Sequence, residues 1–169
     1  MDLRLYHNSH EFYYRSSFGA VPSGSRLILR LRASGSDAQN CRARIRLWQI
    51  NVGESFVPMS YEDGIFTGIV TIPPKGCLLW YYFIIDDGHR TFYYGNNYDR
   101  LGGEGAKYPD VPPAYQVTVY DKDAHTPDWF KHAIVYQIFP DRFRHGTHTS
   151  GRLYGKKGAV IHSDWDDVP

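Results

Sequence analysis

Aromatic side chains are the most abundant candidates for binding chemistry in this sequence. Its 169 residues include 14 Tyr, 9 Phe and 4 Trp, so aromatic residues make up 16% of the chain. The flat apolar face of a sugar stacks on Trp and Tyr rings, while neighbouring polar groups hydrogen-bond to its hydroxyls. For any one ring, packing in a core or between domains is the stronger alternative. The rings considered as a sugar-stacking platform are Trp48, Trp80, Tyr82, Tyr93, Tyr94 and Tyr98.

Tyr98 is the best single candidate for substrate binding among these rings. It lies beside Asn96 and Asn97 in residues 95–113, a stretch with several Gly and Pro that is longer than most loops of a compact domain. Loops present side chains to solvent and often carry function. We therefore expect Tyr98 to contact a ligand, and we expect Trp80, in contrast, to lie in the core.

Six arginines alternate with apolar residues in two nearby segments. Residues 26–32 read Arg-Leu-Ile-Leu-Arg-Leu-Arg, and residues 41–47 read Cys-Arg-Ala-Arg-Ile-Arg-Leu. This period of two predicts two strands with a basic outer face, joined as a hairpin by the polar residues 35–40. Such a face could bind an anionic partner. With a formal net charge of only +1, a solvated or internally paired face is the stronger interpretation, and nucleic acid or an anionic membrane is not expected as a partner.

The remaining pattern up to residue 121 is that of short strands separated by turns. Gly accepts the positive φ of a tight turn, so Asp87-Gly88 predicts a two-residue hairpin. Residues 78–85 are apolar on both faces, which predicts a central strand or one covered from outside the domain. Residues 1–121 are thus predicted to be mainly β, an immunoglobulin-like antiparallel β-sandwich. The further strands are expected at residues 64–72, 78–86, 89–94 and 115–121.

The pattern changes after Tyr120. Residues 122–131 read as a polar linker with a short helical turn, in which Thr126 is the N-cap and Pro127 the first helical residue. The nearly unbroken apolar residues 133–139 are typical of a strand buried on both faces of a parallel sheet. Hardly an apolar residue follows. The predicted organisation is a sandwich over residues 1–121, a linker over 122–131 and the beginning of another domain over 132–169.

The sequence Tyr-Gln-Ile-Phe-Pro-Asp-Arg-Phe at residues 136–143 resembles the start of the catalytic barrel in the α-amylase superfamily. The similarity is strongest to neopullulanases, cyclomaltodextrinases and amylopullulanases, in which a β-sandwich and a Trp-containing linker precede this element. Residues 165–169 resemble the loop that follows in some members. The resemblance implies that residues 132–169 contain the first strand of a truncated (β/α)8 barrel. A complete barrel needs roughly 250 residues.

The resemblance further implies an activity for the parent enzyme, the retaining hydrolysis of α-glucans such as starch, pullulan or cyclodextrin. Retention requires two carboxyl groups about 5 Å apart. In this superfamily they lie on later barrel strands, so no catalytic residue is assigned and the 169-residue chain is predicted to be inactive. Asp141, at the exit of the first strand, either lines the substrate cleft or, as the stronger interpretation, braces the strand end together with Arg142.

No cofactor is predicted in this chain. Many members of the superfamily hold calcium just after the Pro-Asp-Arg-Phe element, but residues 144–151 contain neither a carboxylate nor Asn. Calcium is therefore expected, if anywhere, elsewhere in the parent enzyme. The three histidines His145, His148 and His162 lack the spacing of a zinc site and are expected to be solvated.

The alternative to a hydrolase fragment is a freestanding sandwich that binds carbohydrate or a protein. The partners expected are an α-glucan, the missing catalytic barrel and a second copy of the chain. Residues 1–7 lack the basic and apolar regions of a secretory signal, so the cytoplasm is the expected location. Cys41 and Cys77 then read as thiols of a reducing compartment, although two cysteines also allow a single disulfide.

Overall fold

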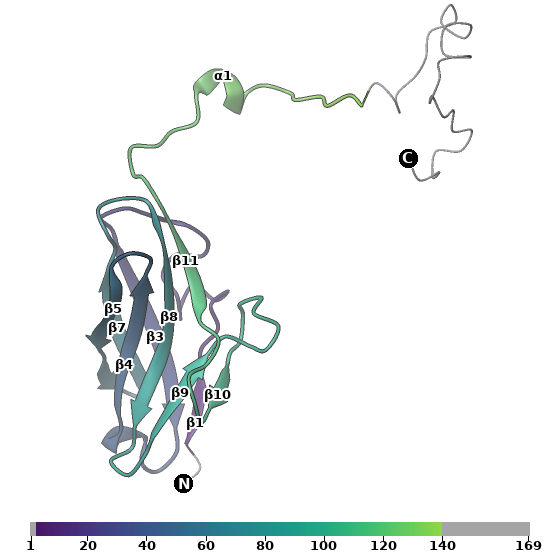
Figure 1. Ribbon diagram of the computed structural model, residues 1–169. Helices are drawn as coiled ribbons and strands as arrows, with labels where there is room; N and C mark the ends of the chain where they lie inside the picture. Colours follow the sequence, from purple (N-terminus) through teal and green to yellow (C-terminus); the bar gives the residue numbers. More distant parts are fainter. Residues whose placement is uncertain (1–2, 140–169) are drawn as a thin grey trace, which may run out of the picture. The chain divides into compact units, whose positions relative to one another are not determined.

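The computed structural model describes residues 3–139 and divides the chain into two units, residues 1–124 and 125–169 (Figure 1). In the first unit, strands form two sheets. The smaller sheet has the order β1-β3-β7-β6, with every neighbouring pair antiparallel. Its strands are β1 Arg4–Tyr6, β3 Arg26–Ser34, β6 Ser60–Glu62 and β7 Ile65–Thr71.

The larger sheet is built around β8 Cys77–Asp86. One edge of β8 pairs with β4, which in turn pairs with β5. The other edge pairs first with β11 and then with β9, and these carry β2 and β10. All pairs are antiparallel except β2 with β11. The apolar run at residues 78–85 is thus central, one of the two alternatives that its sequence allowed. The other strands are β2 Val21–Pro22, β4 Arg42–Gln49, β5 Gly53–Pro58, β9 Thr91–Gly95, β10 Ala106–Tyr108 and β11 Tyr115–Tyr120.

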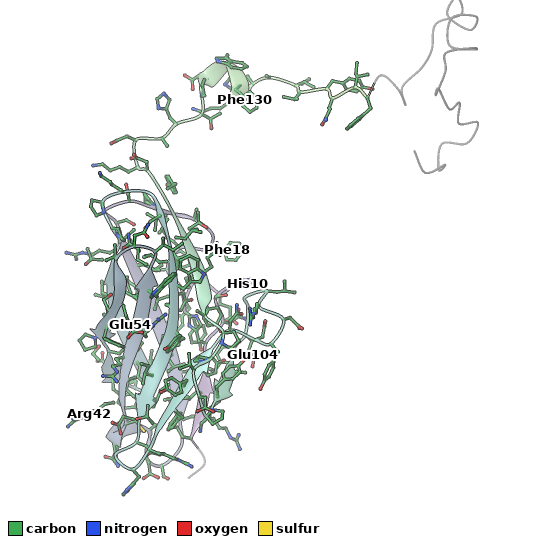
Figure 2. All side chains as sticks on the ribbon, in the orientation of Figure 1. His10, Phe18, Arg42, Glu54, Glu104 and Phe130 are labelled. Carbon is green, nitrogen blue, oxygen red and sulfur yellow. The ribbon has the colours of Figure 1, made fainter. Side chains whose placement is uncertain are left out.

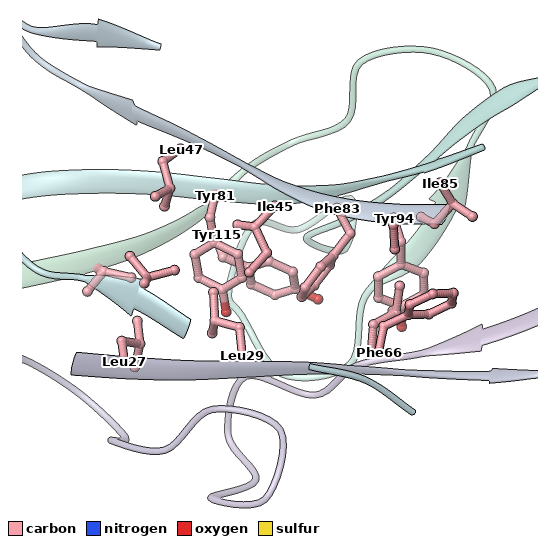
Figure 3. Packing of buried hydrophobic residues seen from close by; sticks show 14 of the residues in the cluster. Leu27, Leu29, Ile45, Leu47, Phe66, Tyr81, Phe83, Ile85, Tyr94 and Tyr115 are labelled. Carbon is pink, nitrogen blue, oxygen red and sulfur yellow. The ribbon is translucent and has the colours of Figure 1, made fainter. Parts of the chain in front are cut away.

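The core lies between the two sheets, where alternate residues of each strand point inward. Leu27 and Leu29 of β3 face Ile45 of β4 and the rings of Tyr81 and Tyr115 (Figure 3). All five side chains are almost fully buried. Burying a Leu or Ile side chain contributes about 1.5–3 kcal/mol. The period-two pattern therefore becomes two apolar faces packed against each other, and the mainly β, antiparallel prediction is confirmed.

The predicted hairpin across residues 35–40 is wrong. Strand β3 pairs with β1 and β7, whereas β4 pairs with β5 and β8, so the segment connects the two sheets through the short 3-10 turn Ala38–Asn40. Alternation identifies the inward residues of each strand but not its neighbour. The six arginines are consequently divided between two outer faces. There four of them lie over aromatic rings: the Arg30 guanidinium, for example, lies 4.8 Å from the Tyr13 ring, and that of Arg46 lies 5.2 Å from Tyr82.

Two turns differ in detail from the sequence expectation. The β8–β9 hairpin closes between Asp87 and Arg90, so its central pair is Gly88-His89, with Gly88 at φ +85°. The Asp87 carboxylate accepts hydrogen bonds from the backbone N–H groups of His89 and Arg90, which shifts the turn by one residue. The expected loop at residues 95–113 contains the short strand β10, because its backbone pairs with the edge of β9.

One buried histidine joins the two sheets. His7 follows β1; its Nδ1 donates a hydrogen bond to the backbone carbonyl of Arg30 in the smaller sheet, at 2.7 Å. The Tyr81 hydroxyl of the larger sheet donates to His7 Nε2 at 3.0 Å, because Nδ1 carries the proton of the neutral ring. The edges of the Phe83 and Tyr115 rings pack around the imidazole. His7 thereby fixes the beginning of the chain between the sheets.

The second unit begins with a short helix. Helix α1 spans Asp128–Lys131, and Lys131 Nζ lies 2.8 Å from Asp128 Oδ1. Pro127, not Thr126, is the residue at the N-cap, and no side chain caps the helix. Residues 133–139 have no assigned secondary structure, so the barrel strand stays a prediction that depends on strands beyond the described residues. Within residues 3–139, no helix is long and apolar enough to cross a membrane.

We expect His7 to make the sandwich sensitive to acid. Burial is the main cause that lowers the pKa of His7 to about 4; the hydrogen bond to the Arg30 carbonyl opposes this shift, and the nearby charge of Arg15 adds to it. The ordinary pKa is about 6.5, so the unfolded chain takes up this proton before the folded one, and stability falls as the pH drops from 6.5 toward 4. A shift of this size corresponds to about 3 kcal/mol. Urea unfolding at pH 7 and pH 4 measures the loss.

The variant His7→Leu removes the titrating ring, and its free energy of unfolding is expected to lose this part of the pH dependence. His89→Gln, at an exposed turn histidine, is the matched control and should keep the wild-type dependence. Equal pH dependence in His7→Leu and wild type would contradict the role assigned to His7.

We also expect the sandwich to fold without residues 126–169. The entire buried cluster of the described chain comes from residues 3–119. Residues 133–139 are an uncharged, β-prone segment of the kind that pairs with other chains when left uncovered. Thermal unfolding and light scattering of the shortened and full chains should show similar stability and less aggregation for the shortened chain. Earlier unfolding of the shortened chain would place residues 133–139 in the core of the sandwich.

Candidate functional site

A groove of about 600 Å³ lies on the sandwich unit. Its walls are the segment between β1 and β2, the loop after β9 and the backbone that leads into β11. His10 and Phe18 lie on the same side of the sandwich, with their rings edge to face at 5.3 Å (Figure 2). Trp80 of β8 also lines the groove. The site therefore combines aromatic rings with polar groups from three parts of the chain.

Two asparagines hold the loop after β9 in shape. The Asn96 Oδ1 accepts hydrogen bonds from the backbone N–H groups of Asn97 and Gly102, both at 3.0 Å. The Asn97 Nδ2 donates to the carbonyl of Gly102 at 2.6 Å. Gly102 and Gly103 have φ near +80°, which glycine adopts without strain. This loop is therefore a preorganised wall of the groove.

Ser9 and Arg15 attach the opposite wall to the sandwich. The Ser9 backbone donates to the Gly103 carbonyl at 3.0 Å, and the Gly103 N–H donates to the Ser9 hydroxyl at 2.9 Å. The Arg15 guanidinium donates to the carbonyl of Gln116 in β11 at 3.2 Å and to that of Gly19 at 2.7 Å. Arg15 is only 7% exposed. These bonds join the segment between β1 and β2 to the larger sheet.

Trp80 is not in the core, contrary to the sequence expectation. It points to the outer face of the larger sheet, where it is half-buried and pairs across the strands with Trp48, their ring centroids 5.1 Å apart. Because β8 is apolar on both faces, its sequence does not identify the inward set. Glu54 is the cross-strand partner of Trp48, and Gln116 is that of Trp80. The four side chains form a row across four strands, with the carboxylate and the amide at its ends.

Tyr98 does not line the groove. It is 78% exposed on the loop, with its ring against the edge of Tyr108 at 5.3 Å. Tyr82 and Tyr93 share the outer face with the indoles, while Tyr94 belongs to the core. The structure thus brings Trp48 and Trp80 together, and a role for Tyr98 in binding stays a prediction.

Several other predicted positions lie outside the described residues. These are Asp141, the three histidines of the C-terminal segment and the stretch considered for calcium. Among residues 3–139, no group of three or more His, Cys, Asp or Glu could hold a metal ion. Cys41 and Cys77 are free thiols, and burial raises the pKa of both. The described part of the chain therefore offers neither a disulfide nor an activated cysteine.

The residues that sequence reasoning missed come from the segment between β1 and β2. His10, Arg15 and Phe18 lack a periodic pattern, and only their fold brings them opposite Trp80. In the sequence, the only indication of these residues was a segment that mixes His, Arg and aromatic residues without a periodic pattern. It was weak because such a segment more often forms an ordinary surface loop.

Fold and site together define a two-sheet antiparallel β-sandwich module with a paired-tryptophan face and an aromatic, polar groove. No protein-family model matches the chain. The chain is similar to amylopullulanases: it is 37% identical over 179 residues to that of Thermoanaerobacterium saccharolyticum, covering 98% of this chain and 14% of the relative. The amylopullulanase of Thermoanaerobacterium thermosulfurigenes is 37% identical over 180 residues, which cover 98% of this chain and 9% of the relative. The amylopullulanase of Thermoanaerobacter thermohydrosulfuricus is 36% identical over 182 residues, which cover 99% of this chain and 12% of the relative.

The chain thus spans 9–14% of the length of these curated relatives. The similarity covers nearly the whole chain, the sandwich as well as the segment that follows it. The resemblance to this group of α-amylase-superfamily enzymes, which the sequence at residues 136–143 suggested, is confirmed.

Proposed function

We propose that this chain is the N-terminal part of a glycoside hydrolase that acts on α-glucans of the starch, pullulan or cyclodextrin type. The observation that carries the proposal is the similarity of 98–99% of the chain to amylopullulanases at 36–37% identity. The sandwich is its accessory domain, and residues 132–169 begin the catalytic barrel. The parent enzyme retains the anomeric configuration and works in the cytoplasm.

In this proposal the sandwich supports a reaction that other residues perform. Retention needs a nucleophilic carboxylate and a second carboxyl group that acts as acid and base. The superfamily carries them on later barrel strands, so the 169-residue chain contributes no catalytic residue. Asp141 braces the exit of the first barrel strand or lines the cleft there. The partners of the sandwich are the barrel, an α-glucan and, in an oligomer, a second copy of the chain.

A specific observation favours carbohydrate binding by the sandwich itself as a second candidate function. Trp48 and Trp80 form a pair of half-buried indoles on the outer face of the larger sheet, next to the groove. Glu54 and Gln116 at the ends of this row supply an acceptor and an amide for sugar hydroxyls. The arrangement suits the face of a pyranose ring, and it serves either an accessory domain or a freestanding module.

We expect the purified 169-residue chain to release no reducing sugar from starch, pullulan or cyclodextrin, because both catalytic carboxyl groups lie beyond it. A reducing-sugar assay at high protein concentration checks this. A longer chain that includes the encoded barrel is the positive control and should hydrolyse at least one of the three. Turnover by the 169-residue chain that is lost on mutating one of its own residues would contradict the proposal.

We expect maltooligosaccharides to bind the chain weakly, with millimolar Kd. Trp80→Ala should weaken binding by up to about tenfold, since stacking on an aromatic ring contributes about 0.5–1.5 kcal/mol. Tyr98→Ala should weaken it less, because this ring lies outside the groove. Isothermal titration of both variants measures the difference. If Tyr98→Ala has the larger effect, the site is the loop tip and not the tryptophan face. No binding by the wild-type chain would leave the sandwich only a structural role.

A further inference from the structure

The groove beside Trp80 is lined by basic residues and by no acidic ones. Arg15, Arg100 and His10 line it, and no Asp or Glu is among its lining residues. The acidic residues Asp99 and Glu104 of the same loop are exposed and lie outside the lining. The chain as a whole is nearly neutral, with a formal charge of +1, so this local excess is not a consequence of overall composition.

Arg15 carries a buried charge that no carboxylate of the described chain balances. Its hydrogen-bond partners are neutral: the carbonyls of Gln116 and Gly19 and the hydroxyl of Tyr81. Its buried Nε has no hydrogen-bond partner within residues 3–139. A guanidinium has five N–H donors, so part of its hydrogen-bonding capacity is unused. Burying an ion without a counter-charge costs several kcal/mol, and a bound anion would offset part of that cost.

Arg100, at the rim of the groove, has a strained backbone. Its φ is +59°, in the left-handed region that residues other than Gly, Asn and Asp rarely adopt. The other described non-Gly residues with positive φ are Asn51 and Asp63, for which this region is common. Strained residues of this kind cluster at ligand-binding positions. The Asn96 and Asn97 hydrogen bonds that hold the loop therefore also hold Arg100 beside the groove.

The neighbouring backbone amides leave the recognition of an anion to the arginines. The Gly102 N–H donates to Asn96 Oδ1 and the Gly103 N–H donates to Ser9 Oγ, so neither is free to cradle a phosphate. Guanidinium groups, in contrast, match the geometry of phosphate oxygens and bind them through charge-assisted hydrogen bonds. The Trp80 ring beside them offers a stacking surface for a sugar.

We propose that this groove binds a saccharide that carries a phosphate ester, with the sugar face on Trp80 and the phosphate between Arg15 and Arg100. The proposal rests on the α-glucan function proposed above and specifies a class of ligand for it. A neutral glucan would leave the charge of Arg15 unbalanced, whereas the ester supplies the missing counter-charge.

The test compares three probes on the full 169-residue chain by isothermal titration: maltotriose, maltotriose phosphorylated at a C6 hydroxyl, and inorganic phosphate. We expect the ester to bind about tenfold more tightly than maltotriose, because a charge-assisted hydrogen bond is roughly twice as strong as a neutral one. Inorganic phosphate should bind more weakly than the ester. A shift of the Trp80 indole N–H signal in NMR spectra reports whether the ester occupies this groove.

Variants separate the two arginines from general electrostatics. Arg100→Gln should remove most of the advantage of the ester over maltotriose, and Trp80→Ala should weaken both sugars. Arg42→Gln makes the same change of charge at an exposed position at the far end of the sandwich (Figure 2) and should change neither. Arg15→Lys keeps the charge but not the planar fork, and it should weaken the ester more than maltotriose, with thermal unfolding confirming that it folds.

Four results would overturn the proposal. Equal affinity for maltotriose and its ester would leave a neutral glucan site and the proposed hydrolase function intact. Equal affinity for the ester and inorganic phosphate would show an adventitious anion only. Equal effects of Arg42→Gln and Arg100→Gln would show a non-specific attraction. The absence of any binding at about 10 mM would remove the site altogether, while the hydrolase function would still be decided by the activity of the longer chain.

Discussion

The buried imidazole of His7 connects the two sheets of the sandwich, and the segment that lines the groove begins directly after it. His7 joins the backbone of Arg30 in one sheet to the hydroxyl of Tyr81 in the other. The Tyr94 hydroxyl lies 3.2 Å from both the backbone nitrogen and the backbone oxygen of His7, so strand β9 shares the same anchor. Buried polar groups of this kind stabilise a fold only when each is satisfied. A neutral His7 meets that condition, whereas a protonated one would also bury a positive charge near that of Arg15.

The groove is a direct consequence of this anchor. Immediately after His7, Ser9 bonds to the loop at Gly103, and Arg15 then bonds to β11. The Tyr81 ring stacks on Tyr115, which lines the groove, at a centroid distance of 5.1 Å. The core network and the wall of the groove therefore share residues, so the proposed binding would depend on the same few side chains as the stability.

The two proposed functions of the sandwich do not compete for the same residues. Support of a catalytic barrel requires a stable module, which the central strand β8 and the packed inner faces provide. Recognition of a saccharide requires the outer face, where Trp48 and Trp80 lie outside the core. Because alternate residues of β8 serve the two faces, one strand supplies both the core and the candidate binding surface.

The sequence by itself determined the mainly β class and the inward residues of β3 and β4, because period two is a local pattern. For the apolar run in β8 it allowed either a central strand or one covered from outside the domain. The eight residues at 136–143 also indicated the relatives, since such a motif needs no tertiary contact to be recognised. Only the tertiary structure decided that β3 and β4 lie in different sheets and that Trp80 points outward. It likewise brought His7 to Tyr81 and Arg15 to Gln116, pairs separated by 74 and 101 residues. Such contacts depend on which strands become neighbours, and a pattern within one strand carries no information about its partner.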